Sequence, residues 1–193
     1  GVFHMYGGSI SGNTADQGGG VYIVNDGAFN LFGGSIGGTK DGEANTAKQG
    51  GGVYMNGGMF EMSGDASITG NTTTTKTAGH GGGVYVNEGT FTMSGNASIK
   101  NNNTADESYG GGVYVGGGTF TMNGSASITG NTANQGGGVF ASAGKFIMSG
   151  GSITDNDGNG VCVSKKDIFT VSGTPTVKEN KRNSDASNVW LDG

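Results

Sequence analysis

Short segments in which apolar and polar residues alternate recur along the whole chain. Within residues 81–100 three of them follow one another: Val84-Tyr85-Val86, Phe91-Thr92-Met93 and Ala97-Ser98-Ile99. Successive side chains of a β-strand point to opposite faces, so each segment predicts a short strand with one apolar face and one polar face. One unit of the sequence therefore contains three short strands.

The same order of segments returns in about six units along the chain. Each unit opens with a triple glycine followed by an aliphatic and an aromatic residue, and these openings lie at Gly18, Gly50, Gly81, Gly110 and Gly136, with a reduced one at Gly160. The period shrinks from 32 residues between Gly18 and Gly50 to 24 residues between Gly136 and Gly160. One unit cannot bury its apolar face alone, whereas units stacked about 4.8 Å apart can. We predict an all-β, single-domain right-handed parallel β-helix with three short strands per coil and about six to seven coils.

Stacking aligns equivalent residues of successive coils into columns. One inward column contains phenylalanines, namely Phe29, Phe60, Phe91, Phe120, Phe146 and Phe169. A second contains isoleucines, namely Ile10, Ile36, Ile68, Ile99, Ile128 and Ile153. Asparagines follow the third strand at Asn13, Asn45, Asn71, Asn131 and Asn156. Stacked amides hydrogen-bond between coils, so these residues predict an asparagine ladder at one corner of the helix.

The repeat extends over residues 1–193 as one domain: a partial coil at 1–17, coils that start at 18, 50, 81, 110, 136 and 160, and the start of a further coil at 188–193. An uncapped β-helix exposes a full rung of strand edges, which favours pairing with other chains. We therefore expect a fragment of a longer chain, with neighbouring sequence on at least one side. We also expect end-to-end or lateral self-association.

Composition and charge argue against several classes of protein for this chain. The chain has 44 glycines but one proline and no strict three-residue period, which excludes collagen. A formal net charge of −5 makes nucleic acids and anionic membranes poor partners, and no apolar run is long enough for membrane insertion. Cys162 is the only cysteine, and the two histidines, His4 and His80, fall on different elements as solvated side chains. No disulfide within the chain, no metal and no cofactor is expected.

An aromatic column is the main candidate for ligand binding. With Val21 and Ile23 facing inward, Tyr22 faces outward, and so do its equivalents in later coils. The candidate ligand-binding residues are Tyr22, Tyr54, Tyr85, Tyr114 and Phe140. Two interpretations stay open: the rings stack on one another beneath the variable loops, or they present flat faces to sugar rings or to an apolar partner. If the valines faced outward instead, the column would belong to the core.

Other surfaces offer weaker candidates. The variable loops at residues 37–49, 72–80, 101–109 and 132–135 leave the helix on one edge and could bind a polar ligand. Glu61 is the only carboxylate on the outward positions of the second strand, so a polysaccharide lyase or hydrolase would lack an acid and base pair. Outward threonines at Thr90, Thr92, Thr119 and Thr121 suggest ice binding, but this array lasts only two coils. Cys162 takes the place of the aromatic residue and should point outward or lie under a terminal loop.

The run GGGVYVNEGTFTMSGNASI at residues 81–99 resembles the right-handed β-helix repeats of large bacterial cell-surface proteins, including adhesin-like and autotransporter-like passengers. It is also similar to the chlamydial polymorphic outer membrane proteins, whose Gly-Gly-Ala-aliphatic motif appears here as Gly-Gly-Gly-Val, while their Phe-x-x-Asn motif is not reproduced cleanly. The resemblance covers almost the whole chain. It implies a non-catalytic extracellular protein of the bacterial surface that serves as an adhesin or structural spacer, with a host or environmental glycan or protein as partner. A carbohydrate-binding module is the alternative, and a polysaccharide-active enzyme and an ice-binding protein are lesser ones.

Overall fold

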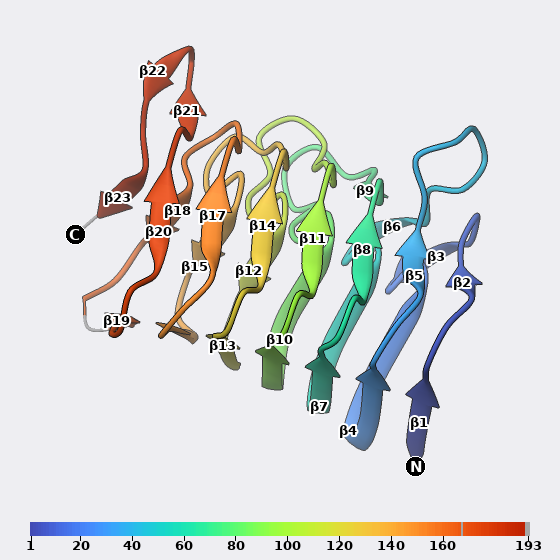
Figure 1. Ribbon diagram of the computed structural model, residues 1–193. Helices are drawn as coiled ribbons and strands as arrows, with labels where there is room; N and C mark the ends of the chain where they lie inside the picture. The colour runs from blue at the N-terminus through green and yellow to red at the C-terminus, as the bar shows by residue number, and fades with distance from the viewer. Residues whose placement is uncertain (167, 192–193) are drawn as a thin grey trace.

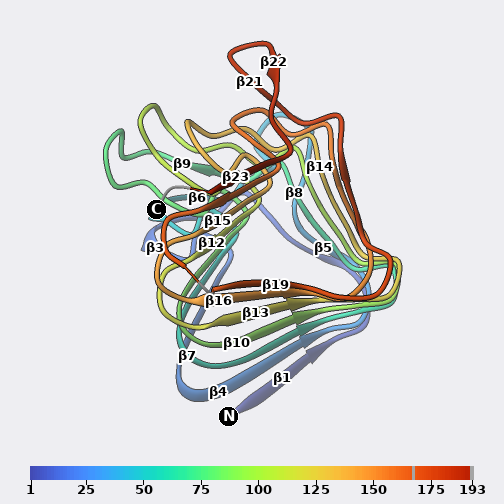
Figure 2. The same ribbon diagram turned by 90° about the vertical axis from the view of Figure 1, so that its left-hand side faces the viewer.

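The computed structural model of the chain describes residues 1–166 and 168–191, and this part contains strands and no helix. It is a parallel β-solenoid of about seven turns, with the two termini at opposite ends of the stack (Figure 1). Viewed along the axis, the coils enclose a three-sided cross-section, and loops project from one corner (Figure 2). The predicted all-β parallel β-helix is therefore confirmed.

The largest sheet contains eleven strands and combines the predicted first and second strands of each coil. In the coils that start at Gly18, Gly50 and Gly81 the first and second strands form one continuous strand, with register shifts such as the one between Asn25 and Ala28. From the coil that starts at Gly110 onward they are separate strands. A bulge bends a strand while keeping its pairing on both sides, which explains the continuous form. The strands are β1 (Val2–Met5), β4 (Val21–Leu31), β7 (Val53–Met62), β10 (Val84–Met93), β12 (Val113–Val115), β13 (Thr119–Met122), β15 (Val139–Ala141), β16 (Lys145–Met148), β18 (Val161–Val163), β19 (Phe169–Val171) and β23 (Val189–Leu191).

The predicted third strand of each coil forms a second sheet, of seven strands. These are β2 (Ser9–Ile10), β5 (Ser35–Gly37), β8 (Ser67–Thr69), β11 (Ser98–Lys100), β14 (Ser127–Thr129), β17 (Ser152–Thr154) and β20 (Thr176–Lys178). A third, short sheet lies partly within the segments that we expected as loops, and it contains β3 (Thr14–Gln17), β6 (Thr46–Gln49) and β9 (Thr72–Thr73). Its strands are polar on most positions, so no alternation of apolar residues marks them. Near the C-terminus, β21 (Lys181–Arg182) and β22 (Asp185–Ala186) pair antiparallel.

Both predicted inward columns are present. The phenylalanine column runs from Phe3 to Phe169, and neighbouring rings are stacked with centroids 4.7 to 5.3 Å apart. The isoleucine column is in register through the second sheet, and Val177 continues it in the last coil. Between Ile36 and Ile153 its side chains have no exposed surface. These columns form one contiguous core along the axis.

The asparagine ladder is also confirmed, and it is longer than predicted. Each amide oxygen accepts from both the backbone N–H and the side-chain Nδ2 of the asparagine in the preceding coil, at 2.9 to 3.2 Å. The full ladder is Asn13, Asn45, Asn71, Asn102, Asn131, Asn156, Asn180 and Asn188. Apart from the two end residues, these asparagines are at most 1% exposed. Every buried amide is thus satisfied by the coils above and below it.

Glycine is required in the triplet that opens each coil for two separate reasons. Gly81 has φ +72°, a left-handed conformation that favours glycine. Gly82 has an ordinary φ, but a Cβ there would lie 2.6 Å from the carbonyl oxygens of Gly111 and Asn103. At Gly83 the same atom would lie 2.6 Å from the Gly112 oxygen and 3.1 Å from Asn102 Nδ2. The glycines therefore let successive coils approach closely beside the ladder.

Replacing one amide of the ladder should destabilise the whole stack. In an Asn102→Ala variant, the buried backbone N–H and amide nitrogen of Asn71 lose their acceptor, and so we expect the free energy of unfolding to fall by about 2 kcal/mol or more. The matched control is Asn103→Ala, at the next residue, whose side chain is exposed and should change stability by less than about 0.5 kcal/mol. Urea unfolding followed by circular dichroism measures both. Equal effects would contradict a stabilising ladder.

Candidate functional site

The five predicted aromatic residues form one column on the outside of the main core. Tyr22, Tyr54, Tyr85, Tyr114 and Phe140 are direct partners from coil to coil, and Cys162 and Trp190 continue the column. The valines beside them face the core, as predicted, so the tyrosines point away from it. Neighbouring rings have centroids 4.8 to 5.5 Å apart. The column is thus a second apolar cluster, separate from the core.

Two loop residues cover the part of this column formed by Tyr114 and Phe140. His80 stacks on Tyr114 with ring centroids 4.5 Å apart, and Tyr109 stacks on Phe140 at 4.7 Å. His80 and Tyr109 also stack on each other at 5.0 Å, and the Tyr109 backbone N–H donates to His80 Nδ1. The prediction that His80 is a solvated loop residue is therefore wrong. Its ring covers part of the aromatic column.

Burial separates Tyr22 from the other four candidates. Tyr54, Tyr85, Tyr114 and Phe140 are at most 9% exposed, whereas Tyr22 is 48% exposed at the N-terminal end. The geometry favours the first of the two open interpretations for the buried four, namely stacking beneath the loops. Ligand binding through Tyr22 stays a prediction.

The environment of the column keeps its polar groups neutral. Burial, together with the neighbouring Tyr114 and Tyr54, raises the pKa of the Tyr85 hydroxyl far above its usual value. Burial first, and then Tyr22 and Glu88, raise the pKa of Tyr54. Burial lowers the pKa of His80 below 6.5. Because low-dielectric surroundings disfavour the charged form of each group, the cluster behaves as an apolar layer at neutral pH.

Cys162 lies in the same outward column and is fully buried. It stands between Phe140 and Trp190 in the strand register, and its Sγ donates to Gln135 Oε1 over 3.5 Å. The thiol therefore takes the place of an aromatic ring where the last loops are short.

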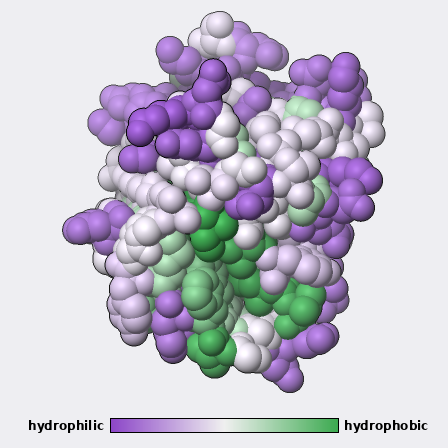
Figure 3. All heavy atoms as spheres, turned by 90° about the vertical axis from the view of Figure 1, so that its right-hand side faces the viewer, coloured by the Kyte–Doolittle hydropathy of each residue, from purple (hydrophilic) through white to green (hydrophobic). Residues whose placement is uncertain are grey.

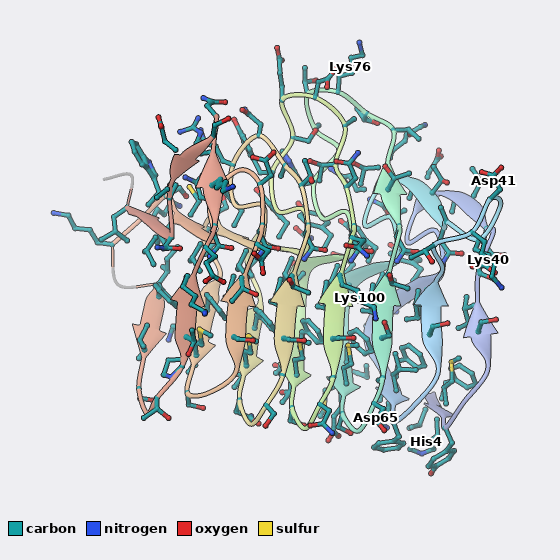
Figure 4. The ribbon with its side chains drawn as sticks, turned by 45° about the horizontal axis from the view of Figure 1, so that its top comes forward. His4, Lys40, Asp41, Asp65, Lys76 and Lys100 are labelled. Carbon is teal, nitrogen blue, oxygen red and sulfur yellow. The ribbon has the colours of Figure 1, made fainter. Side chains whose placement is uncertain are left out.

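The charged side chains labelled in Figure 4 lie on different parts of the surface, whereas Asp155, Asp157, Glu179 and Lys181 line one small hollow. Lys76 lies at a loop tip, Lys100 on the outer face of β11, and His4 near the opposite edge (Figure 4). Within residues 1–166 and 168–191, no group of three or more His, Cys, Asp or Glu side chains could hold a metal ion. The four threonines of the ice-binding hypothesis are in register, but Met59 and Glu61 adjoin them on one side, and Lys145 and Ile147 on the other. The array is therefore confined to two coils, as its sequence predicts.

An open hollow lies at the N-terminal end of the stack. A hollow of about 750 Å³ is lined by Val2, Phe3 and residues 21–29 of β4. Smaller polar hollows lie elsewhere, one of about 250 Å³ beside Ser35 and Thr69 and one of about 200 Å³ beside Asp157 and Glu179. Figure 3 shows a band of apolar atoms across the N-terminal end, where the coil beneath is uncovered.

The fold and this cluster define the class of the protein: a parallel β-solenoid repeat protein with a covered aromatic column. No family model, no curated protein and no solved structure matches the chain. In the part of the chain that the structure describes, no helix is long and apolar enough to cross a membrane.

The lid over the aromatic column should make stability depend on pH. His80 has a folded-state pKa below its ordinary 6.5, so protons bind the unfolded chain more tightly. Its contribution to stability is fully present above pH 6.5 and is lost as the pH falls towards the lowered pKa. We expect the urea concentration at the unfolding midpoint of the wild type to fall as the pH is lowered from 6.5 towards this lowered pKa. A His80→Phe variant should lose this dependence, while the control His4→Phe should keep it. An unchanged slope in His80→Phe would contradict the assignment.

Proposed function

We propose that this chain is a non-catalytic structural spacer, a β-solenoid rod displayed extracellularly at a bacterial surface. The observation that supports this most is the uninterrupted register of its columns from the first coil to the last. Phenylalanine rings, isoleucines and asparagine amides each continue through the stack without a break. At about 4.8 Å per coil, seven strands of one sheet extend over roughly 30 Å.

Such an arrangement supports a load-bearing or distance-setting role. Each coil contacts its neighbours through backbone hydrogen bonds, such as Val53 N–H to Gly83 and Val84 N–H to Gly112. In a repeat array of this kind, stability is close to a sum of terms between neighbouring coils. Bending the rod would break the geometry of several columns at once, because their side chains are close-packed. The stack of coils is therefore a stiff rod that holds its two ends at a fixed distance.

The outer surface supports the non-catalytic part of the proposal. The ion pairs Lys48–Asp16, Lys76–Asp106 and Lys178–Glu179 all lie on exposed side chains. General acid and base catalysis needs two such groups held within reach of one substrate atom, usually in a cleft that excludes water. The hydroxyl-rich second sheet and the scattered lysines offer a solvated face instead.

A carbohydrate-binding adhesin is the second candidate, and one observation favours it. Tyr22 is half exposed and lines the hollow of about 750 Å³ at the N-terminal end. An exposed aromatic face beside a hollow is a common way to hold a sugar ring. The four buried rings of the column would then support Tyr22 without touching a ligand.

A glycan array decides between the two candidates. We expect the folded wild-type chain to bind no glycan above background, because Tyr22 is the only one of the five candidate residues that is more than 9% exposed. The test variant is Tyr22→Ala, and the matched control is Tyr6→Ala, a tyrosine 75% exposed near the same end but outside the hollow. Glycan binding that Tyr22→Ala loses and Tyr6→Ala keeps would replace the spacer with the carbohydrate-binding module.

The bacterial surface location is supported by the resemblance of residues 81–99 to surface β-helix repeats. An antibody raised against the loop tip at Lys76, a side chain that is 79% exposed, should label intact source cells as strongly as permeabilised ones. The same antibody saturated with the loop peptide serves as the control. Labelling that appears only after permeabilisation would contradict the location and leave the glycan result unaffected.

A further inference from the structure

A small polar hollow opens on the outer face of the second sheet. Its volume is about 250 Å³, and its lining includes side chains of β5, β8 and β11. Gly37, Thr69 and Lys100 are direct partners in the strand register, so they follow one another across the hollow from coil to coil. Ser9 and Ser11 of β2 add two hydroxyls at its edge. The parts of this hollow that carry charge or an unpaired hydroxyl all belong to later coils.

Thr69 supplies a buried hydroxyl that has no hydrogen-bond partner. Its side chain is 7% exposed and lines the hollow, and its Oγ1 has no partner within the described part of the chain. In later coils the equivalent hydroxyls of Thr154 and Thr129 bond to each other over 3.5 Å. Thr69 has no such neighbour, because Gly37 precedes it in the column and Lys100 follows it. A buried hydroxyl without a partner is rare and marks a position where an external polar group can bind.

The loop of residues 38–43 forms one wall of the hollow. It crosses the chain directly after β8, since a Cβ on Gly70 would collide with the Gly38 carbonyl. The loop is closed by Glu43, whose backbone N–H donates to the Lys40 carbonyl at 3.1 Å and whose Oε2 accepts from the Lys40 N–H at 3.1 Å. Lys40 Nζ lies 3.8 Å from the other carboxylate oxygen. The Glu43 charge at this wall is therefore compensated within the loop.

Lys100 lies on the opposite side of the hollow, on the outer face of β11 (Figure 4). In the described residues, the lysines that form ion pairs are Lys40, Lys48, Lys76 and Lys178. Lys100 is exposed and forms none there. Its ammonium group is thus the uncompensated charge of the hollow, which favours a ligand with one negative charge.

We propose that this hollow binds a small hydroxy acid, with the ligand carboxylate at the Lys100 ammonium and a ligand hydroxyl at Thr69 Oγ1. The proposal goes beyond the spacer function and does not depend on it. It concerns free molecules in solution, which a glycan array does not display.

The chemistry of the lining selects this class of ligand. A hydroxyl both donates and accepts, so it can pair with Thr69 and with the neighbouring Ser67. A change of the χ1 rotamer turns Thr69 Oγ1 towards the ligand. A carboxylate forms a charge-assisted hydrogen bond with an ammonium group. An apolar acid would leave Thr69 unpaired, and an uncharged polyol would leave Lys100 without a counter-charge.

The size and the lining argue against a larger ligand. Pockets for drug-sized molecules hold about 300 to 1,000 Å³, whereas this hollow holds about 250 Å³. None of the described residues that line it is aromatic, so a sugar ring would find no flat face on which to stack. A hydroxy acid of a few carbon atoms fits these limits.

The first test compares three small molecules on the wild-type chain of residues 1–193. Glycerate contains the carboxylate and two hydroxyls, propionate lacks the hydroxyls, and glycerol lacks the carboxylate. Each is titrated against the ¹⁵N-labelled chain, and the backbone amide signals of Thr69 and Lys100 are followed by NMR. We expect glycerate to shift both signals with a Kd on the order of 1 mM, and the other two to bind at least about tenfold more weakly.

The second test removes each of the two groups from the protein. Thr69→Val keeps the shape and loses the hydroxyl, and we expect the Kd for glycerate to rise about fivefold to tenfold. Its control is Thr129→Val on the same face, outside the hollow, which should leave the Kd unchanged. Lys100→Met keeps the length of the side chain and loses the charge, so the Kd should rise about tenfold or more, while the exposed Lys145→Met serves as its control. Thr69→Ser keeps the hydroxyl and should keep wild-type affinity.

Several outcomes would overturn the proposal. No glycerate-dependent shift at Thr69 and Lys100 in the wild type shows that the hollow does not bind this class. Propionate that binds as tightly as glycerate indicates simple attraction to a lysine. Equal weakening by Thr69→Val and Thr129→Val, in chains that keep the wild-type circular dichroism spectrum, shows that the unpaired hydroxyl does not contact the ligand. The comparison of the three molecules uses the wild type alone, so it decides the question even where a variant fails to fold.

Discussion

The buried amide ladder is the constraint on which the rest of the structure depends. A side-chain amide has two donors and an acceptor with two lone pairs, and burying it without partners is costly. In this solenoid the partners of Asn102 are Asn71 and Asn131, so each amide is satisfied only when both neighbouring coils stand in one register. That register also aligns the phenylalanine and isoleucine columns, because a slip of one residue would turn every inward side chain of a strand to the outer face.

The covered aromatic column follows from the same register. Tyrosines that point away from the core at equivalent positions of successive coils are either exposed to solvent or stacked on one another. The loops at His80 and Tyr109 close over Tyr114 and Phe140, in the two coils with the longest chain between the ladder asparagine and the next triple glycine. At the N-terminal end no such loop reaches Tyr22, and at the other end Cys162 replaces the ring.

Much of the fold could be predicted from the sequence, because alternation and period directly encode which side chains stack. Asn102 was missed among three consecutive asparagines, although the rule that a ladder asparagine follows the inward isoleucine by three residues, as Asn71 follows Ile68, identifies it. The third sheet was missed because polar strands such as β6 leave no apolar signal. At the candidate site the outward direction of the tyrosines was predicted, whereas their cover depends on how loops from other coils fold back, which local pattern does not specify.

The position of the variable loops has a further consequence. Most of the difference between period lengths of 32 and 24 residues lies between the inward isoleucine and the next triple glycine, so chain can be gained or lost there while the three columns stay in register. Whole coils are interchangeable for the same reason, since each presents one pattern of partners to the coil before it and the coil after it. Unequal recombination between repeats would therefore yield a rod of different length and unchanged cross-section. The number of coils in such a protein can therefore change, while the structure of each coil stays the same.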